Sequence, residues 1–313
     1  MVIAMIDRLI EAIKAKQNPT VAGLDTRLEY LPQSFLDGLG FDVRDFSTAA
    51  QAILQFNKNL VDALADVVPA VKVQIAYYEM YGVAGVECFY QTCAYAKAKD
   101  LVVMADAKRN DIGATAEAYS NAFLGKTPVN GQMLDAFNAD MLTVNPYLGI
   151  DGIAPFVADC KKQDKGIFVL VKTSNVSSGD FQDLYLADGR QVFEAVGDKV
   201  AEWGQSAIGK YGYSDVGAVV GATYPQQGAK LRARLPGVFF LIPGYGAQGA
   251  MAQDVALMFD EKGTGGIVNA SRSLLLAYQK AGTQDFAAAA REEALRMQAD
   301  LLQALRSQNR WPV

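Results

Sequence analysis

The sequence predicts an α/β protein, a (β/α)8 TIM barrel that residues 1–313 form as a single domain. Two observations support this fold. Short apolar runs alternate along the chain with longer segments whose apolar residues recur at helical spacing, which is typical of a parallel sheet covered by helices. About eight such units fit into the chain, and polar residues follow nearly every apolar run, where a barrel places its functional side chains.

The individual elements follow from these patterns. Residues 1–16 alternate like an amphipathic helix, and Asp7, Arg8 and Glu11 interrupt any secretory apolar run. The expected strands are residues 20–25, 70–75, 101–107, 140–145, 166–172, 216–221, 238–243 and 265–269. The expected helices are residues 46–65, 80–99, 112–123, 191–210, 247–259 and, closing the chain, 285–306. Residues 175–189 are rich in Ser, Gly and Asp and predict a long loop over the active site.

Composition excludes several classes of function. The chain has a net charge of −5 and no basic run with interleaved aromatic residues, so we expect no nucleic-acid partner. No apolar window is long enough to span a bilayer, so we expect no membrane association. The chain has no histidine, so proton transfer falls to Asp, Glu, Lys, Tyr or Cys. Cys88, Cys93 and Cys160 form no metal-binding pair, which indicates buried thiols in a reducing, cytoplasmic compartment.

The run from Asp106 to Gly113 is the most informative stretch of the sequence. Asp106 and Lys108 end the third expected strand, and alternate residues of a strand project to the same side. Asp111 follows within one turn and could cap the next helix, in which case the charges of this run would be structural ion pairs. Alternatively, the run places two carboxylates around an ammonium group where barrel enzymes carry out their chemistry.

A glycine-rich run, Gly244 to Gly249, satisfies the G-x-G-x-x-G pattern of dinucleotide-binding proteins. Its late position and the lack of an acidic residue about 20 residues downstream argue against a dinucleotide. The loops after strands seven and eight of a barrel commonly bind phosphate. Gln248 and Arg272 fit that role, as an amide donor and a bidentate guanidinium, and simple turn chemistry is the alternative.

With these residues placed, the chain resembles the orotidine 5′-phosphate decarboxylase family, in its longer bacterial type 2 branch. The signature D-x-K-x-x-D-I is present as Asp106, Lys108, Asp111 and Ile112, with Thr115 as a further match. The resemblance extends over nearly the whole barrel, in residues 23–25, 71–74, 172–175, 220–223, 242–249 and 269–272. The family's glycine before the phosphate-binding arginine is Ser271 here.

The resemblance implies a function and a role for each matching residue. The implied reaction is decarboxylation of orotidine 5′-phosphate to uridine 5′-phosphate, the last step of de novo pyrimidine biosynthesis, without cofactor or metal, by a homodimer with shared sites. Catalysis would fall to four residues, Lys108, Asp106, Asp111 and Lys72. Lys108 would protonate C6 beside Asp106, and Asp111 would reach into the neighbouring subunit's site. The substrate would be bound by Asp25, Thr115, Ser174, Gln248 and Arg272.

Other functions stay open at this point. Ser177 or Ser178 could replace Ser174 at the pyrimidine. A metal-dependent sugar-phosphate enzyme would need a further carboxylate near the second strand, and Glu79 lies several residues beyond its end. A Schiff-base aldolase would use Lys72, Lys108 or Lys172. A non-catalytic nucleotide-binding barrel is the remaining alternative.

Overall fold

Eight parallel strands close into a barrel in the computed structural model, which describes residues 4–246 and 249–311. The barrel strands, in the order in which they pair, are β1 (Thr20–Gly23), β2 (Ala70–Gln74), β3 (Val102–Arg109), β6 (Met141–Val144), β7 (Gly166–Lys172), β8 (Val216–Val220), β9 (Phe240–Pro243) and β10 (Gly266–Ala270). The last strand pairs with the first, with Thr20 opposite Val268. The predicted fold is therefore confirmed, and each strand matches its expected position to within two residues at either end.

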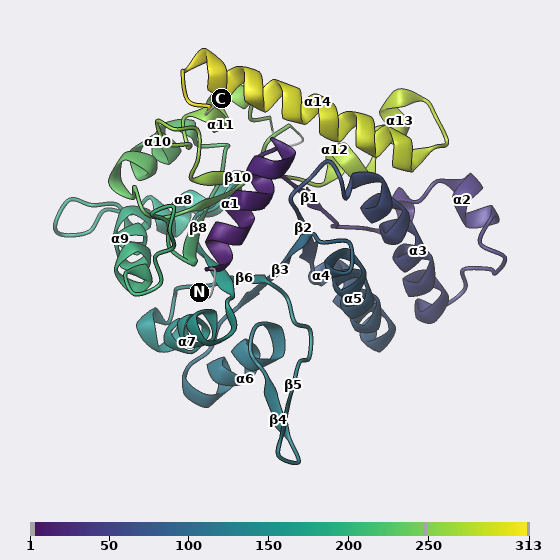
Figure 1. Ribbon diagram of the computed structural model, residues 1–313, viewed down its shortest axis with the longest axis horizontal. Coiled ribbons are helices and arrows are strands. Elements are labelled where there is room, and N and C mark those ends of the chain that lie inside the picture. Colours follow the sequence, from purple (N-terminus) through teal and green to yellow (C-terminus); the bar gives the residue numbers. More distant parts are fainter. Residues whose placement is uncertain (1–3, 247–248, 312–313) are drawn as a thin grey trace.

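Helices cover the outside of the barrel and alternate with the strands (Figure 1). The longer ones are α3 (Phe46–Leu64), α5 (Gly82–Lys97), α6 (Gly113–Phe123), α7 (Ala154–Gln163), α9 (Val192–Gly204), α10 (Pro225–Arg234) and α14 (Phe286–Ser307). Shorter helical segments are η1 (Leu28–Tyr30), α2 (Gln33–Asp37), α4 (Ala76–Glu79), η2 (Gly149–Gly152), η3 (Val176–Ser178), α8 (Gly179–Gln182), α11 (Ala252–Ala256), α12 (Arg272–Leu275) and α13 (Ala277–Ala281).

Local sequence explains where several helices begin and end. α3 begins at a capping box, in which the Asp45 side chain accepts from the Thr48 amide and Thr48 returns a bond to the Asp45 amide. α14 begins where Asp285 accepts from the Ala288 amide. The expected helix at residues 191–210 ends early, at Gly204, where a Cβ would lie 2.4 Å from the Ser214 hydroxyl. A helix was expected at residues 247–259, and in the described part of this range the structure has only the short helix α11.

The N-terminal helix α1 (Met5–Lys16) closes one end of the barrel. Its apolar side chains pack with residues of the barrel interior, including Met104, Phe168 and Leu241. Figure 1 shows α1 lying across the end of the barrel that faces the viewer. The opposite end of the barrel, formed by the carboxyl ends of the strands, is therefore available for the functional side chains.

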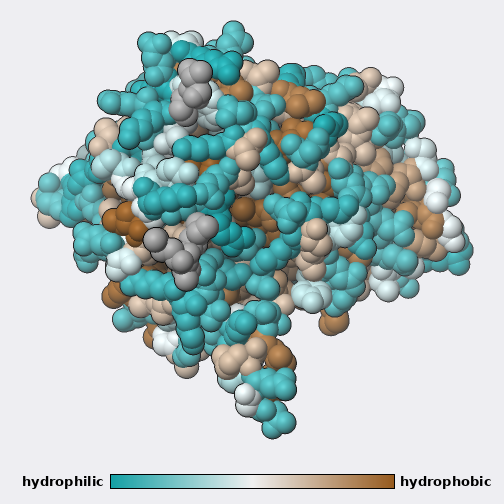
Figure 2. Space-filling model, viewed as in Figure 1, coloured by the Kyte–Doolittle hydropathy of each residue, from teal (hydrophilic) through white to brown (hydrophobic). Residues whose placement is uncertain are grey.

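A two-stranded antiparallel hairpin, β4 (Thr127–Val129) and β5 (Gln132–Leu134), stands apart from the barrel. It was not expected from the sequence, and it projects from the body of the molecule in both the ribbon and the space-filling view (Figures 1 and 2). Its side chains are exposed, including those of Val129, Met133 and Leu134. Elsewhere, hydrophilic residues cover most of the face shown in Figure 2.

Within the described residues, no helix has the length and apolar character required to cross a membrane. The three cysteines are free and buried, as the sequence predicts. They serve as small apolar core residues, because burial raises the pKa of each thiol.

Candidate active site

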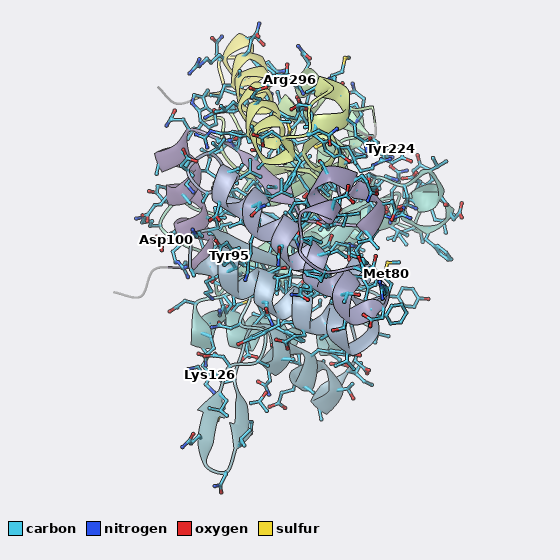
Figure 3. The ribbon with its side chains drawn as sticks, turned by 90° about the vertical axis from the view of Figure 1, so that its right-hand side faces the viewer. Met80, Tyr95, Asp100, Lys126, Tyr224 and Arg296 are labelled. Carbon is cyan, nitrogen blue, oxygen red and sulfur yellow. The ribbon has the colours of Figure 1, made fainter. Side chains whose placement is uncertain are left out.

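The carboxyl ends of the barrel strands form the candidate site. Figure 3 shows Met80 and Tyr224, which follow barrel strands, on the side of the molecule opposite Asp100, which precedes β3. A cavity of about 370 Å³ opens at these strand ends. Its lining residues are Lys72, Asp106, Lys108, Thr143, Leu170, Thr173, Ser174, Asn175, Val219, Leu241, Pro243 and Asn269.

Asp106 and Lys108 meet inside this cavity, as their spacing predicts. The Lys108 Nζ lies 2.6 Å from Asp106 Oδ1. Lys108 has a positive φ of 47°, and the pairing of β3 with β6 shifts register between Ala105 and Arg109. A positive φ is uncommon for a residue with a side chain and is often maintained at functional sites. The Lys108 amide donates to Thr143 Oγ1 at 3.0 Å, which holds this irregular turn of backbone in place.

The Asp106 carboxylate is held by four neighbours. Its Oδ1 accepts from Lys108 and from the Thr143 hydroxyl at 2.9 Å. Its Oδ2 accepts from the Gln74 amide at 2.9 Å and lies 3.0 Å from the Lys72 Nζ. Burial alone would raise the pKa of Asp106, but the two ammonium groups lower it well below its usual value. Asp106 is therefore a fixed negative charge at neutral pH.

Lys72 links Asp106 to Asp25. Its Nζ donates to Asp25 Oδ1 at 2.9 Å, and its side chain is only 4% exposed. Burial alone would lower the pKa of Lys72, but the Asp106 and Asp25 carboxylates more than offset this and raise it. Lys72 is therefore a permanent cation, and the site contains a row of alternating charges from Asp25 through Lys72 and Asp106 to Lys108.

A second pocket, of about 300 Å³, adjoins this cavity, since Asn269 lines both. Its lining residues are Asp25, Arg27, Tyr30, Tyr77, Gly244, Tyr245, Asn269, Ala270, Ser271 and Arg272. A Cβ at position 23 would lie 1.9 Å from Ser271 Oγ, so Gly23 allows the end of β1 to approach this loop. Arg272 thus lines a pocket beside the main cavity. The predicted Gln248 lies outside the described residues.

Ser174 lines the cavity next to the end of β7, whereas the two neighbouring serines do not. Ser178 is buried and accepts from Lys172 Nζ at 3.0 Å, and Ser177 is exposed to solvent. Lys172 is fully buried and also donates to Asp183 Oδ1 at 2.8 Å. Lys172, one of the lysines considered for a Schiff base, thus contacts residues 175–189 and does not line the cavity.

Asp111 and Thr115 lie outside the cavity that the single chain forms. The interpretation of Asp111 as a helix cap is wrong, because α6 begins at Gly113 with Ile112 as its N-cap residue. Asp111 Oδ1 instead accepts from the amide of Ile112 at 2.8 Å. Ile112 and Thr115 are exposed, so this segment is accessible to another molecule.

Several residues of the site were not singled out by the sequence. Gln74 and Asn269 were in matching segments but carried no expected role, and Thr143 lies within a buried strand that gives no polar signal.

Glu79, considered as a metal ligand, accepts a hydrogen bond from Arg109 Nη2 at 2.7 Å. Among the described residues, no group of three carboxylates or thiols is arranged to hold a metal ion.

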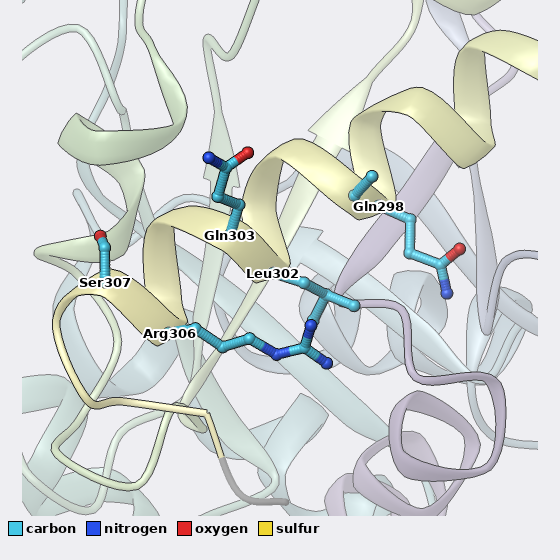
Figure 4. Close-up of a pocket in the computed structure, with 6 residues that line it drawn as sticks. Gln298, Leu302, Gln303, Arg306 and Ser307 are labelled. Carbon is cyan, nitrogen blue, oxygen red and sulfur yellow. The ribbon is translucent and has the colours of Figure 1, made fainter.

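A further hollow, of about 700 Å³, lies along the outer face of α14. Figure 4 shows Gln298, Leu302 and Arg306 directed to one side of this helix and Gln303 to the other. Gln298 donates to the carbonyl of Lys16 in α1, which closes the opposite end of the barrel, so this surface is separate from the candidate site.

Comparison with known proteins finds relatives that match most of this chain. The orotidine 5′-phosphate decarboxylase / HUMPS family matches residues 39–284. An orotidine 5′-phosphate decarboxylase from Caldicellulosiruptor bescii is 47% identical over 281 residues, which cover 90% of this chain and 92% of that protein. An orotidine 5′-phosphate decarboxylase from Clostridium tetani is 43% identical over 305 residues, which cover 97% of this chain and 99% of that protein. The structure of Leishmania donovani OMP decarboxylase superimposes with a TM-score of 0.71 at 29% identity, covering 96% of this chain and 99% of that one.

The fold and the site define a class of protein, a (β/α)8-barrel enzyme with a carboxylate–lysine array joined to an arginine-lined pocket. Within that class, the chain belongs to the orotidine 5′-phosphate decarboxylase / HUMPS family.

Proposed function

We propose that this protein decarboxylates orotidine 5′-phosphate to uridine 5′-phosphate and CO2, the last step of de novo pyrimidine biosynthesis. The observation that carries the proposal is the contact of Lys108 with Asp106 in a cavity that adjoins the pocket of Arg272. The curated relatives, which match nearly the whole chain, carry the name of this activity.

The charges of the two adjoining pockets favour one orientation of the substrate. Its phosphate enters the pocket of Arg272, with Gln248 as a further donor, and its pyrimidine enters the cavity of Lys108. Asp25 and Lys72, which lie at the junction, hydrogen-bond the ribose. Ser174 contacts the pyrimidine edge. Residues 175–189 form the active-site loop, since they follow Ser174 directly.

The chemical step breaks the bond between C6 and the carboxylate and leaves the electron pair on C6. No adjacent carbonyl can absorb this charge, so the protein must stabilise it electrostatically. Lys108, held in place by Asp106, stabilises the developing carbanion and then donates its proton to C6. Because these residues supply both the charge and the proton, the step requires neither a metal nor an organic cofactor.

Asp106 also acts on the ground state. It is a fixed negative charge beside the position of the substrate carboxylate. At about 4 Å and an effective dielectric constant near 20, the repulsion of two such charges is on the order of 4 kcal/mol. The departure of neutral CO2 relieves this repulsion, and binding of the remote phosphate offsets it in the bound substrate.

The proposal extends to the assembly and its compartment. The exposed segment of Asp111 and Thr115 completes the site of a second subunit, so the active form is a homodimer with shared sites. The proposal includes a single domain over residues 1–313, which is supported by the pairing of β1 with β10 from opposite ends of the chain. The free, buried cysteines fit a reducing cytoplasm.

The decisive experiment follows the ultraviolet absorbance of orotidine 5′-phosphate with purified protein and excess EDTA. Loss of substrate with formation of uridine 5′-phosphate is expected, at a rate that EDTA does not change. Activity that disappears with EDTA would instead indicate a metal-dependent enzyme. Covalent trapping by borohydride would indicate a Schiff-base enzyme, and binding without turnover would leave a non-catalytic barrel.

A further inference from the structure

The phosphate pocket contains a second arginine that no motif of the sequence identified. Arg27 and Arg272 both line the pocket of about 300 Å³, together with Asp25, which accepts from Lys72 of the main cavity. We propose that Arg27 is a second phosphate-binding cation and that Glu29 competes with the phosphate for it. This inference rests on the proposed function, because the phosphate concerned is that of the nucleotide substrate.

The backbone that carries Arg27 is fixed on both sides. On one side, the Thr26 hydroxyl is buried and donates to Asn57 Oδ1 at 2.7 Å. On the other, the Arg27 carbonyl accepts from the Tyr30 amide at 3.0 Å as η1 begins. The arginine side chain itself is 44% exposed and lies over the Tyr30 ring at 5.8 Å from its centre. A fixed backbone and a partly exposed side chain allow the guanidinium to change partner within the pocket.

The charge of the ligand favours a second cation. A phosphate monoester carries about −1.5 to −2 charges near neutral pH. Arg272 supplies one positive charge, and the nearby Lys72 ammonium is already shared between Asp25 and Asp106. A second guanidinium brings the pocket close to neutrality, and arginine binds phosphate oxygens with two parallel hydrogen bonds.

Glu29 is the present partner of Arg27. Its carboxylate forms an ion pair with the Arg27 guanidinium, and its side chain is 55% exposed. Exposed ion pairs of this kind are weak. A doubly charged phosphate enclosed in the pocket therefore displaces Glu29 from Arg27, and every substrate molecule that binds must first compete with this carboxylate.

Two neutralising variants test this exchange, because they should act in opposite directions. For Arg27→Met we expect the KM for orotidine 5′-phosphate and the Kd for uridine 5′-phosphate to rise about tenfold or more. For Glu29→Gln we expect both constants to fall about two- to fivefold, since the competing carboxylate is removed. Inorganic phosphate, used as a competitive inhibitor, should lose affinity in the first variant and gain it in the second. A merely structural ion pair would give both variants the same sign.

Arg44→Met is the matched control, since Arg44 also forms an exposed ion pair, with Asp42, but does not line the pocket. It should leave all three constants unchanged. A KM and a phosphate affinity that do not change in Arg27→Met would overturn the inference, as would weaker binding in both Arg27→Met and Glu29→Gln. Wild-type protein that does not decarboxylate the nucleotide would instead overturn the proposed function. Thermal unfolding of each variant confirms that the fold is intact.

Discussion

At the scale of single residues, the environment of Asp106 determines what Lys108 can do. Two ammonium groups, a hydroxyl and an amide surround the Asp106 carboxylate, so it has neither the freedom to rotate nor a tendency to take up a proton. Lys108 is thereby held at a fixed point of the cavity. A preorganised charge of this kind needs no rearrangement as negative charge develops on the substrate, which makes it effective in catalysis.

Replacement of Lys108 tests this role directly. Lys108→Met keeps most of the side-chain volume but removes the proton and the charge, so we expect kcat to fall at least about a thousandfold. The Kd for uridine 5′-phosphate, measured by calorimetry, should stay within about tenfold, because the phosphate contacts remain. Lys99→Met is the control, since Lys99 forms an exposed ion pair with Asp62 and does not line the cavity at the carboxyl ends of the strands. Substantial remaining turnover in Lys108→Met would exclude Lys108 as the proton donor.

The residues of the site differ in how far the sequence could predict them. Asp106 and Lys108 are two positions apart on one strand, so local periodicity was enough to predict their contact. Thr143 reaches Asp106 from a strand 37 positions away, and this contact depends on the pairing of β3 with β6. Arg27 lines the same pocket as Arg272 only because β1 lies beside β10. The sequence leaves Asp111 as a possible cap because local patterns place a helix boundary only to within a residue or two, and α6 begins one residue later than expected, at Gly113.

At the scale of elements, the attachment of α1 to the barrel depends on a buried carboxyl group. Asp215 Oδ1 accepts from the Ile6 amide at 2.8 Å, in the first turn of α1. Burial raises the pKa of Asp215 to about 7, the Ile6 amide partly opposes this, and the charge of Asp7 adds to it. A carboxyl group whose pKa is raised by folding stabilises the native state at low pH. That contribution is lost as the pH rises from the unfolded value near 4 to about 7.

Asp215→Asn should therefore stabilise the protein in a pH-dependent way. The asparagine keeps an oxygen for the Ile6 amide but cannot ionise. At pH 8 we expect the free energy of unfolding in urea to rise by on the order of 2 kcal/mol relative to the wild type, with little gain at pH 4. Asp135→Asn, at an exposed position just after the hairpin, is the control. An equal effect at both pH values would contradict the assignment.

Residues 175–189, which we propose as the active-site loop, are attached at their base by an ion pair between the buried Lys172 and the partly exposed Asp183. Lys172, at the end of β7, contacts Ser178 and Asp183, and Gln227 of α10 donates to the same Asp183 oxygen at 3.0 Å. The outer part of the loop exposes Val176, Phe181 and Tyr185. A fixed base with exposed apolar side chains is consistent with a loop that covers a bound nucleotide.

Removal of one partner of this pair should loosen the loop. Asp183→Asn leaves the Lys172 ammonium buried without its carboxylate, so we expect a loss of about 3 kcal/mol in the free energy of unfolding. Limited proteolysis within 175–189 should become faster, and saturating uridine 5′-phosphate should slow it in the wild type. The double variant Lys172→Met/Asp183→Asn removes both charges and should lose less stability than Asp183→Asn alone. Cleavage rates that do not respond to the nucleotide would argue against a loop that closes.

At the scale of the whole molecule, the barrel brings together four of the predicted residues, while Asp111 and Thr115 remain outside the cavity. Asp25, Lys72, Asp106 and Lys108 form their row of charges within one chain. The segment of Asp111 ends in exposed positions at the start of α6, close in sequence to Lys108. In a dimer with twofold symmetry every contact occurs twice, so if this segment of one subunit enters the site of the other, the second subunit returns the same contact and the two sites exchange residues.

Mixed dimers test this exchange. Lys108→Met and Asp111→Asn should each be nearly inactive as homodimers, the first lacking the proton donor and the second the residue lent to the neighbour. In a mixed dimer, one site combines the native Lys108 of the Asp111→Asn subunit with the native Asp111 of its partner. After unfolding and refolding of an equal mixture, about half of the dimers are mixed, and about one quarter of wild-type activity should return. Mixing is verified by mass spectrometry of differently tagged subunits, and verified mixed dimers without activity would show that each site is complete within one chain.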